Sequence, residues 1–273
     1  MTETLQDLRS SIDGIDRKIH SLLIERAGVV AAIGKIKAQE AGNSSQNNLR
    51  LDRECEIIRT RIREHKGQFP ADSLIRIWRE IISASLRIEG SFTVAVRARK
   101  SFASFPFLKN VYDYFGSYTD IRIYNSAISA IAAVRKNTAT VAVLPLNDGD
   151  KPWWLRDIKL KIALRLPAVR KKNDVSADAF VLTGGDYHPS ENDISVLKVF
   201  SSLTASGIKS SFVSCGMTGA VCENCRCTKD SSRRLYLYTV PGYVVSDDAG
   251  IRKLEKMTGI DKVEVLGWYP LMK

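Results

Sequence analysis

The sequence predicts a multi-domain protein in which an all-α unit of three helices precedes a region of alternating strands and helices. Apolar residues recur every three or four positions from Leu5 to Ile36, which is one face of a long amphipathic helix. After Gly90 the pattern changes to short apolar runs separated by polar turns, as in α/β proteins. With 273 residues, 44% of them hydrophobic, the chain has room for two or three globular domains.

The first predicted helix, residues 5–37, would be about 50 Å long at 1.5 Å per residue. A helix of this length is expected to pack against long partners or against a second copy of itself. Arg26 stands where the apolar pattern calls for leucine, and Lys37 projects from nearly the same side. Two cations directed into a helical core predict a buried site for a small polyanion, because an unpaired buried charge is costly. Pairing of Arg26 with a buried acidic residue of a neighbouring helix is the alternative, and periodicity alone leaves both open.

Two more helices follow in the first 90 residues. The polar segment 40–48 ends the first helix, and a second one carries apolar residues at helical spacing from Leu51 to Ile62. The third begins at Asp72 or Ser73. On its last turns Ser85 and Glu89 stand one turn apart, so both can reach the same ligand.

Beyond residue 90 the pattern alternates. We predict strands at 92–96, 121–124 and 140–144 and helices at 107–115 and 127–135, which together form a compact α/β unit. From residue 194 to the end a second unit of strands and helices is expected.

Composition excludes several classes of protein. No run approaches the roughly 18 apolar residues of a membrane span, and the N-terminus has no signal-peptide pattern, so we expect a cytoplasmic protein without a membrane partner. The net formal charge is +11, mostly beyond residue 90, yet no zinc-finger, helix-turn-helix or RNA-recognition signature accompanies it, and no nucleic-acid partner is expected. The three histidines lie near no candidate nucleophile, which argues against histidine-dependent chemistry.

Four cysteines crowd together in the C-terminal part. Cys215, Cys222, Cys225 and Cys227 form the pattern C-x6-C-x2-C-x-C. In a cytosolic chain such a cluster favours zinc or redox chemistry over disulfides. The spacing matches no standard zinc motif, so we predict neither a metal nor a cofactor and keep zinc at these cysteines as the alternative.

The first 90 residues carry a series of short motifs: LR at 8–9, ID at 15–16, LLxxR ending at Arg26, GKxK at 34–37, DRE at 52–54 and IIxxS ending at Ser85. In order and spacing these motifs resemble those of the all-helical chorismate mutases. The resemblance implies an intertwined homodimer that converts chorismate to prephenate, in which each site borrows one arginine from the other protomer.

The same resemblance implies a role for each site residue. Chorismate rearranges in a single unimolecular step, so the enzyme need only hold a compact conformer and stabilise charge on the ether oxygen. Many members carry glutamine at the position of Glu89; an ionised carboxylate cannot donate to that oxygen, so Glu89 is expected to act only when protonated. The implied roles are carboxylate clamps for Arg26 and the partner-supplied Arg9, ether-oxygen contacts for Lys37 and Glu89, ring-hydroxyl binding for Glu54, site ordering for Arg53 and support of a carboxylate contact for Ser85.

A weaker resemblance covers the rest of the chain. AVLPLND at 142–148 and ADAFVLT at 177–183 resemble segments of prephenate dehydratases. The family's Thr-Arg-Phe signature has become Asp178, Ala179 and Phe180, which implies that dehydratase activity has been lost. Segments after residue 194 are similar to a ligand-sensing ACT domain. The phenylalanine-binding motif Glu-Ser-Arg-Pro is absent near 214–217, so feedback by phenylalanine is not expected.

Together these observations predict a chorismate mutase of phenylalanine and tyrosine biosynthesis. We expect a mutase domain at 1–90, a truncated dehydratase-like α/β domain at 91–190 and an ACT-like α+β domain at 191–273. A bifunctional chorismate mutase/prephenate dehydratase is one alternative. Another, of a different class, makes the basic C-terminal half a binding module on a mutase-derived dimer.

Overall fold

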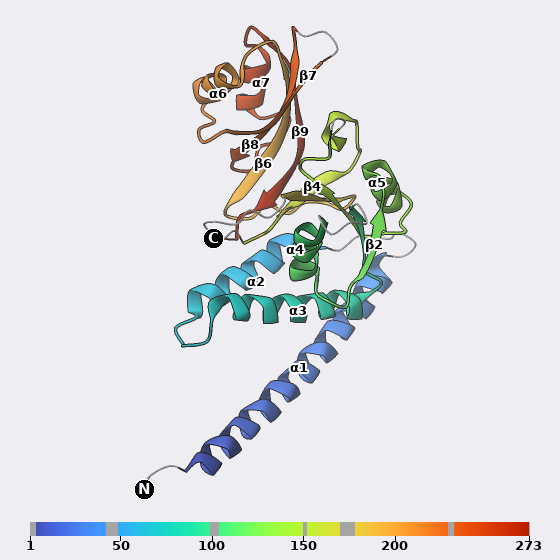
Figure 1. Ribbon diagram of the computed structural model, residues 1–273, viewed down its shortest axis with the longest axis vertical. Helices are drawn as coiled ribbons and strands as arrows, with labels where there is room; N and C mark the ends of the chain where they lie inside the picture. The colour runs from blue at the N-terminus through green and yellow to red at the C-terminus, as the bar shows by residue number, and fades with distance from the viewer. Residues whose placement is uncertain are drawn as a thin grey trace.

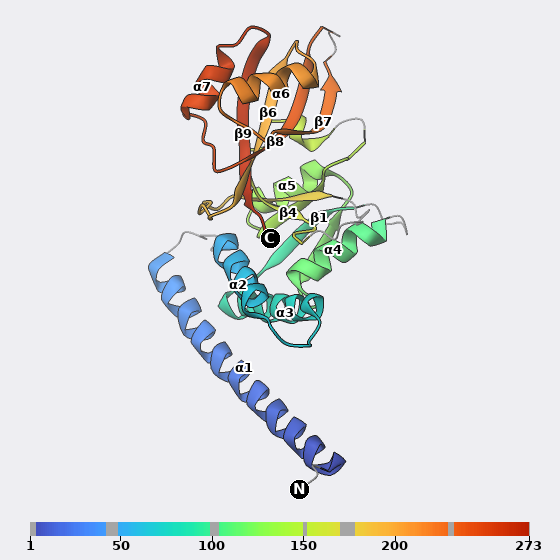
Figure 2. The ribbon, with the colours of Figure 1, turned by 90° about the vertical axis from the view of Figure 1, so that its left-hand side faces the viewer.

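Three helices form the N-terminal part of the protein, whose computed structural model describes residues 4–41, 49–98, 104–149, 152–169, 178–228 and 232–272. They are α1 (Leu5–Ala41), α2 (Leu51–Glu64) and α3 (Ala71–Glu89). The first helix begins with reciprocal hydrogen bonds between Thr4 and Asp7, which satisfy backbone groups that a helix leaves unpaired at its start. It extends away from the rest of the molecule as a long arm (Figures 1 and 2).

The arm leaves its apolar face uncovered. Only its C-terminal half meets α3, where Val30 and Gly34 are buried. The N-terminal half exposes an apolar stripe, formed by Leu5, Leu8, Ile12, Ile15, Ile19 and Leu22, each at least 44% exposed. Such a contiguous exposed apolar surface is typical of an interaction site.

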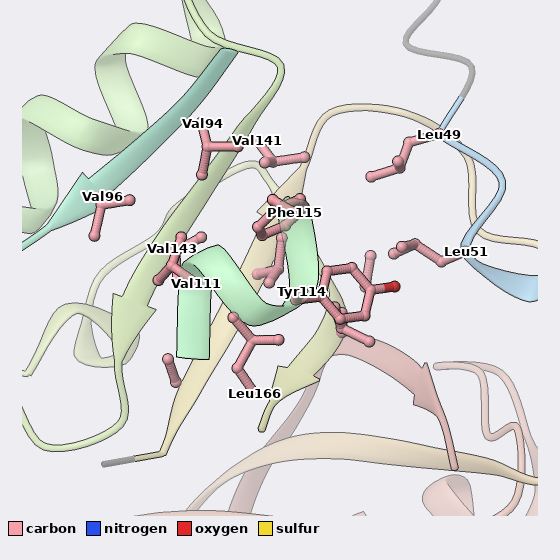
Figure 3. Close-up of a cluster of buried hydrophobic side chains, with 14 of the residues drawn as sticks. Leu49, Leu51, Val94, Val96, Val111, Tyr114, Phe115, Val141, Val143 and Leu166 are labelled. Carbon is pink, nitrogen blue, oxygen red and sulfur yellow. The ribbon is translucent and has the colours of Figure 1, made fainter. Parts of the chain in front are cut away.

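The helices α2 and α3 pack against the region that follows them. Cys55, Ile58 and Ile82 are buried in the same hydrophobic cluster as residues of the first strand and of the next helix. Figure 3 shows Leu51 of α2 close to Tyr114 and Phe115, across the boundary at residue 90. The helical part and the sheet part therefore share one core.

A nine-stranded sheet organises the remainder of the chain, in the order β2-β1-β3-β5-β4-β9-β6-β8-β7. Its first five strands in sequence, with two helices, form a lobe in which β1 pairs in parallel with β2 and β3 and β5 runs antiparallel to β3 and β4. The elements are β1 (Thr93–Arg97), α4 (Phe105–Phe115), β2 (Asp120–Tyr124), α5 (Ala127–Arg135), β3 (Val141–Pro145), the short 3₁₀ helix η2 (Trp153–Leu155), β4 (Lys161–Leu166) and β5 (Ala179–Thr183).

The last four strands form an antiparallel α+β unit with two helices on one side (Figure 2). Its own hydrophobic cluster includes Val199, Phe212 and Leu254, whereas Val196, Leu237 and Leu266 of the same strands pack into the core of the lobe. The elements are β6 (Asp193–Ser201), α6 (Ala205–Ser214), β7 (Val221–Cys227), β8 (Arg234–Pro241), α7 (Ala249–Glu255) and β9 (Ile260–Pro270).

The predicted fold class is confirmed, with helices first and a mixed α/β region after them. No helix among the described residues is both long enough and apolar enough to cross a bilayer.

The two halves of the sheet meet where β4 runs parallel to β9, at the pair Ile162 and Gly267. Gly267 has φ +145°, and a Cβ atom there would lie 2.2 Å from the backbone oxygen of Ile162. Only glycine allows this approach.

Gly267→Ala is therefore expected to lower the free energy of unfolding by about 1–3 kcal/mol, the range typical of overpacking a well-packed core. Urea unfolding measures this. Gly242→Ala is the control, since Gly242 has φ +99° but nothing within 4 Å of the added atom. Equal losses in the two variants would show that backbone strain, and not the β4–β9 contact, sets the effect.

Candidate active site

The contact between α1 and α3 brings four of the predicted site residues together in two pairs. Nη1 of Arg26 donates a hydrogen bond to Oγ of Ser85. Nζ of Lys37 lies 2.5 Å from Oε2 of Glu89. The helices can approach this closely because Gly34 has no side chain: a Cβ there would lie 3.0 Å from Cα of Glu89 and 3.2 Å from its carbonyl oxygen.

The site carries more positive than negative charge. Burial lowers the pKa of the Arg26 guanidinium, the nearby charge of Arg53 lowers it further, and Glu89 raises it. Arg53, on α2, thus acts on the same region as Arg26, Lys37 and Glu89. The positive charges of Arg26 and Lys37, with that of Arg53 nearby, exceed the single negative charge of Glu89, and this excess suits a ligand with two negative charges.

The site can be reached from solvent. The side chains of Lys37 and Glu89 are 32% and 23% exposed, and Arg26 is half-buried. Within the described residues Arg26 forms no salt bridge; its partner Ser85 is neutral. Lys37 thus has an internal acidic partner, Glu89, whereas among the described residues Arg26 has none.

Glu54 lies outside this group. It is 6% exposed and accepts hydrogen bonds from Nη1 of Arg79 at 3.0 Å and from the hydroxyl of Tyr114 at 3.2 Å. Its other oxygen, Oε1, has no hydrogen-bond partner in the described structure. Burial raises the pKa of this carboxyl, and the charge of Arg79 opposes the shift. Consecutive residues of a helix point about 100° apart, so α2 directs Arg53 to solvent and Glu54 into the core.

Arg79 and Tyr114 were not predicted from the sequence. The guanidinium of Arg79 lies 4.1 Å from the ring centroid of Tyr114 and is almost fully buried. The sequence does contain a signal for Arg79: it stands one turn after Ile75 and one turn before Ile82, on the inward face of α3.

Arg9 is exposed on the arm, far from the other site residues. It lies about 25 Å from Arg26 along the same straight helix, at 1.5 Å per residue. It therefore cannot reach the Arg26 of its own chain.

The residues at the Thr-Arg-Phe position serve the packing of the sheet. Asp178 accepts from Arg165 at 2.6 Å, and Arg165 also donates to Glu223 of β7 at 2.6 Å. Ala179 and Phe180 are buried in β5. This network joins the lobe to the α+β unit.

The cysteine cluster lies mainly on the edge strand β7. Cys222, Cys225 and Cys227 are exposed there, while Cys215 follows the last turn of α6. A bulge between Cys222 and Asn224 shifts the register of β7 against β8. In the part of the chain that the structure describes, no three histidine, cysteine or acidic side chains gather as ligands for a metal ion.

The close approach at Gly34 gives a prediction. Gly34→Ala should push α1 away from α3 by a few tenths of an ångström or more and separate Lys37 from Glu89. We expect a fall of about 10- to 100-fold in the rate of any reaction at this site, because small misplacements are costly in catalysis. Gly28→Ala is the control, since nothing lies within 4 Å of an added atom there. A Gly34 variant as active as the control would contradict the placement of the site.

The fold and the site define a class of protein. It has a helical domain with a positively charged site for an anionic ligand, and this domain shares a hydrophobic core with the α/β region that follows it. Comparison with known families specifies this further. Residues 8–90 match the family described as Chorismate mutase type II, so this part of the chain is similar to the domains of that family.

Curated relatives carry the name "Bifunctional chorismate mutase/prephenate dehydratase". The protein from Aquifex aeolicus (strain VF5) is 32% identical over 148 residues, which cover 52% of this chain and 39% of that protein. The one from Neisseria gonorrhoeae is 37% identical over 100 residues, or 35% of this chain and 26% of that protein. The chain thus spans about two fifths or less of the length of these relatives.

Similar solved structures cover about two thirds of the chain. A prephenate dehydratase from Streptococcus mutans has a TM-score of 0.42 at 14% identity, and covers 66% of this chain and 98% of its own. The prephenate dehydratase from Arthrobacter aurescens with L-Phe has a TM-score of 0.44 at 10% identity, covering 66% and 90%. A structure titled "GqqA- a novel type of quorum quenching acylases" has a TM-score of 0.47 at 16% identity, covering 65% and 94%.

Proposed function

We propose that the chain is a chorismate mutase, which converts chorismate to prephenate in the biosynthesis of phenylalanine and tyrosine. The observation that carries this proposal is the α1–α3 contact, which sets Arg26 against Ser85 and Lys37 against Glu89, in the segment that matches the chorismate mutase type II family. The names of the curated relatives support the same reaction.

The chemistry requires positioning and charge, and these residues supply both. Arg26, oriented by its hydrogen bond to Ser85, grips a carboxylate of chorismate. Lys37 donates to the ether oxygen, on which negative charge builds as the C–O bond lengthens. In the absence of substrate Lys37 is held by Glu89, so binding must replace this ion pair with contacts to substrate.

The reaction itself is the test of the proposed function. Purified full-length chain should consume chorismate and form prephenate in the absence of added metal or cofactor. Absence of turnover by folded protein would overturn the proposal.

The second half of the site is proposed to come from another copy of the chain. The exposed apolar stripe of α1 would be covered by the same helix of a second protomer, and this pairing would bring the partner's arginine at position 9 to Arg26. Within one chain Arg9 lies about 25 Å from Arg26, too far to share a site with it, and this distance supports a site in which the partner protomer provides the arginine.

Mixing two inactive variants tests this arrangement. Arg9→Ala and Arg26→Ala should each be nearly inactive, but refolding them together should restore about a quarter of the sites, since each mixed dimer of two-fold symmetry holds one intact site. If Arg9 served the site of its own chain, mixing would restore nothing.

We propose further that the C-terminal region has no dehydratase activity. Asp178 and Ala179 stand at the positions implied for catalytic threonine and arginine, and Asp178 is engaged by Arg165. A hydrophobic cluster confined to the α+β unit supports a division near residue 190, although a second cluster joins this unit to the lobe. Formation of phenylpyruvate from prephenate by the full chain would instead favour the bifunctional alternative.

Glu89→Gln tests the role proposed for this residue. An ionised carboxylate repels the charge that grows on the ether oxygen, whereas an amide can donate to it, so Glu89→Gln should raise kcat/KM several-fold at neutral pH. Glu25→Gln, a change on the exposed side of α1, is the control. An unchanged kcat/KM in the Glu89 variant would remove this role.

A further inference from the structure

A groove of about 530 Å³ lies where the lobe meets the α+β unit. One wall is the segment 156–161, which leads into β4; the other is formed by Ser246 and residues 262–266 of β9. Its volume falls within the range of roughly 300–1,000 Å³ typical of sites for small molecules. It is distinct from the α1–α3 site and shares no residue with it.

Positive charge dominates the lining of this groove. Arg156, Lys159 and Lys161 come from one wall and Lys262 from the other. The carboxylates of the lining are Asp157 and Glu264.

Glu264 is already matched by two cations. Its carboxylate lies 2.5 Å from Nζ of Lys198 and 2.5 Å from Nζ of Lys262. Arg156, Lys159 and Lys161 form no salt bridge with any described residue, so Asp157 is the one lining carboxylate left to oppose them. This excess of positive charge persists at neutral pH, since lysine and arginine stay protonated there.

Two of these residues are constrained, Lys159 in its backbone and Lys161 in its side chain. Lys159 has φ +45°, a left-handed conformation that is unfavourable for residues other than glycine and persists only when the surroundings enforce it. The enforcing contacts are made by Ile158 and Leu160, each 6% exposed, which anchor the turn on both sides of Lys159. Lys161 is fixed as well: its ammonium donates to the carbonyl of Val265 at 3.2 Å.

We infer that this groove binds a small polyanion, a molecule with two or more phosphate or carboxylate groups. Three cations on one wall of a concave surface, none with a salt bridge to a described residue, repel one another, and a multiply charged ligand relieves this repulsion. Nucleic acid fits less well, because single strands bind on exposed aromatic faces. The ring of Trp268, whose centroid lies 5.8 Å from Nζ of Lys161, is packed against Tyr243 with centroids 4.9 Å apart.

Calorimetric titration of the full chain with pyrophosphate and, separately, with citrate at low salt tests this inference. At least one of them should bind saturably with one site per chain; whichever binds more tightly identifies phosphate or carboxylate as the preferred group. In the double variant Arg156→Glu with Lys159→Glu, the dissociation constant should rise by about tenfold or more.

A charge-matched control separates a site from general attraction. Lys209→Glu with Lys253→Glu makes the same change in net charge on exposed positions of α6 and α7, away from the groove. Binding should weaken by about twofold or less in this control. Thermal unfolding checks that both double variants are folded.

Three results would overturn the inference: no saturable binding of either probe, equal weakening in the groove variant and the control, or tighter binding of a single-stranded oligonucleotide than of pyrophosphate and citrate. None of them depends on mutase activity, so this inference and the proposed function can fail separately.

Discussion

Arg26→Ala is expected to lower kcat/KM for chorismate by about a thousandfold, a loss typical of removing a charge-stabilising donor from an active site. Arg26 is the cation that the long helix places among apolar positions, and its guanidinium has no acidic partner within the described residues. Nothing else on α1 can replace its bidentate grip on a carboxylate, and lysine would restore charge without that geometry.

The control for Arg26 is Arg63→Ala, at a position on α2 whose side chain is 70% exposed. It removes the same charge from the helical domain and should leave kcat/KM within about twofold, since surface charges contribute little. Chorismate consumption measured across substrate concentrations separates kcat from KM. An Arg26 variant that keeps more than about a tenth of the activity would overturn the assignment of this residue.

Arg79→Met is expected to lower the free energy of unfolding by about 3–5 kcal/mol, the range for removing one member of a buried ion pair. It would leave the Glu54 carboxylate buried without its counter-charge, and Tyr114 would lose the cation over its ring. Urea unfolding monitored by circular dichroism measures the change. The double variant Glu54→Gln with Arg79→Met should recover much of the loss, because no buried charge remains.

The loss in Arg79→Met should depend on pH. Burial raises the pKa of Glu54 above its ordinary value of 4.5, and without Arg79 the folded-state pKa rises further. A group whose pKa is raised in the folded state stabilises the fold at low pH, and this stability is lost as pH rises through the folded-state value. The deficit of the variant should therefore shrink as pH falls from neutral toward 4.5, and a deficit that is constant with pH would contradict this account.

The elements that depend on local patterns were predictable. Apolar residues at steps of three and four defined α1, and the observed helix runs from Leu5 to Ala41. α5 was predicted within its observed limits, and β1, β2 and β3 within one residue at each end. The long helix was readable from its apolar period, and the strands were readable as short apolar runs bounded by turn residues.

Features that depend on distant contacts were not predictable. Pairing of β4 with β9 rests on the closeness of Ile162 and Gly267, and a lone glycine in a strand does not identify its neighbour. The direction of Glu54 could not be read from its motif, because Arg79 on α3 and Tyr114 on α4 determine it. Arg26 and Lys37, by contrast, lie on one helix, where spacing alone places them on nearly the same side.

The core shared by the helices and the sheet bears on how the chain can be divided. A cut after residue 90 would expose apolar side chains that the sheet region buries, among them Cys55, Ile58 and Ile82. A recombinant fragment that ends there would expose a second apolar surface, on α2 and α3, besides the stripe on α1. It would be prone to aggregate during purification. For the same reason, division of the gene into two would first require polar substitutions on the faces of α2 and α3 that the sheet region covers.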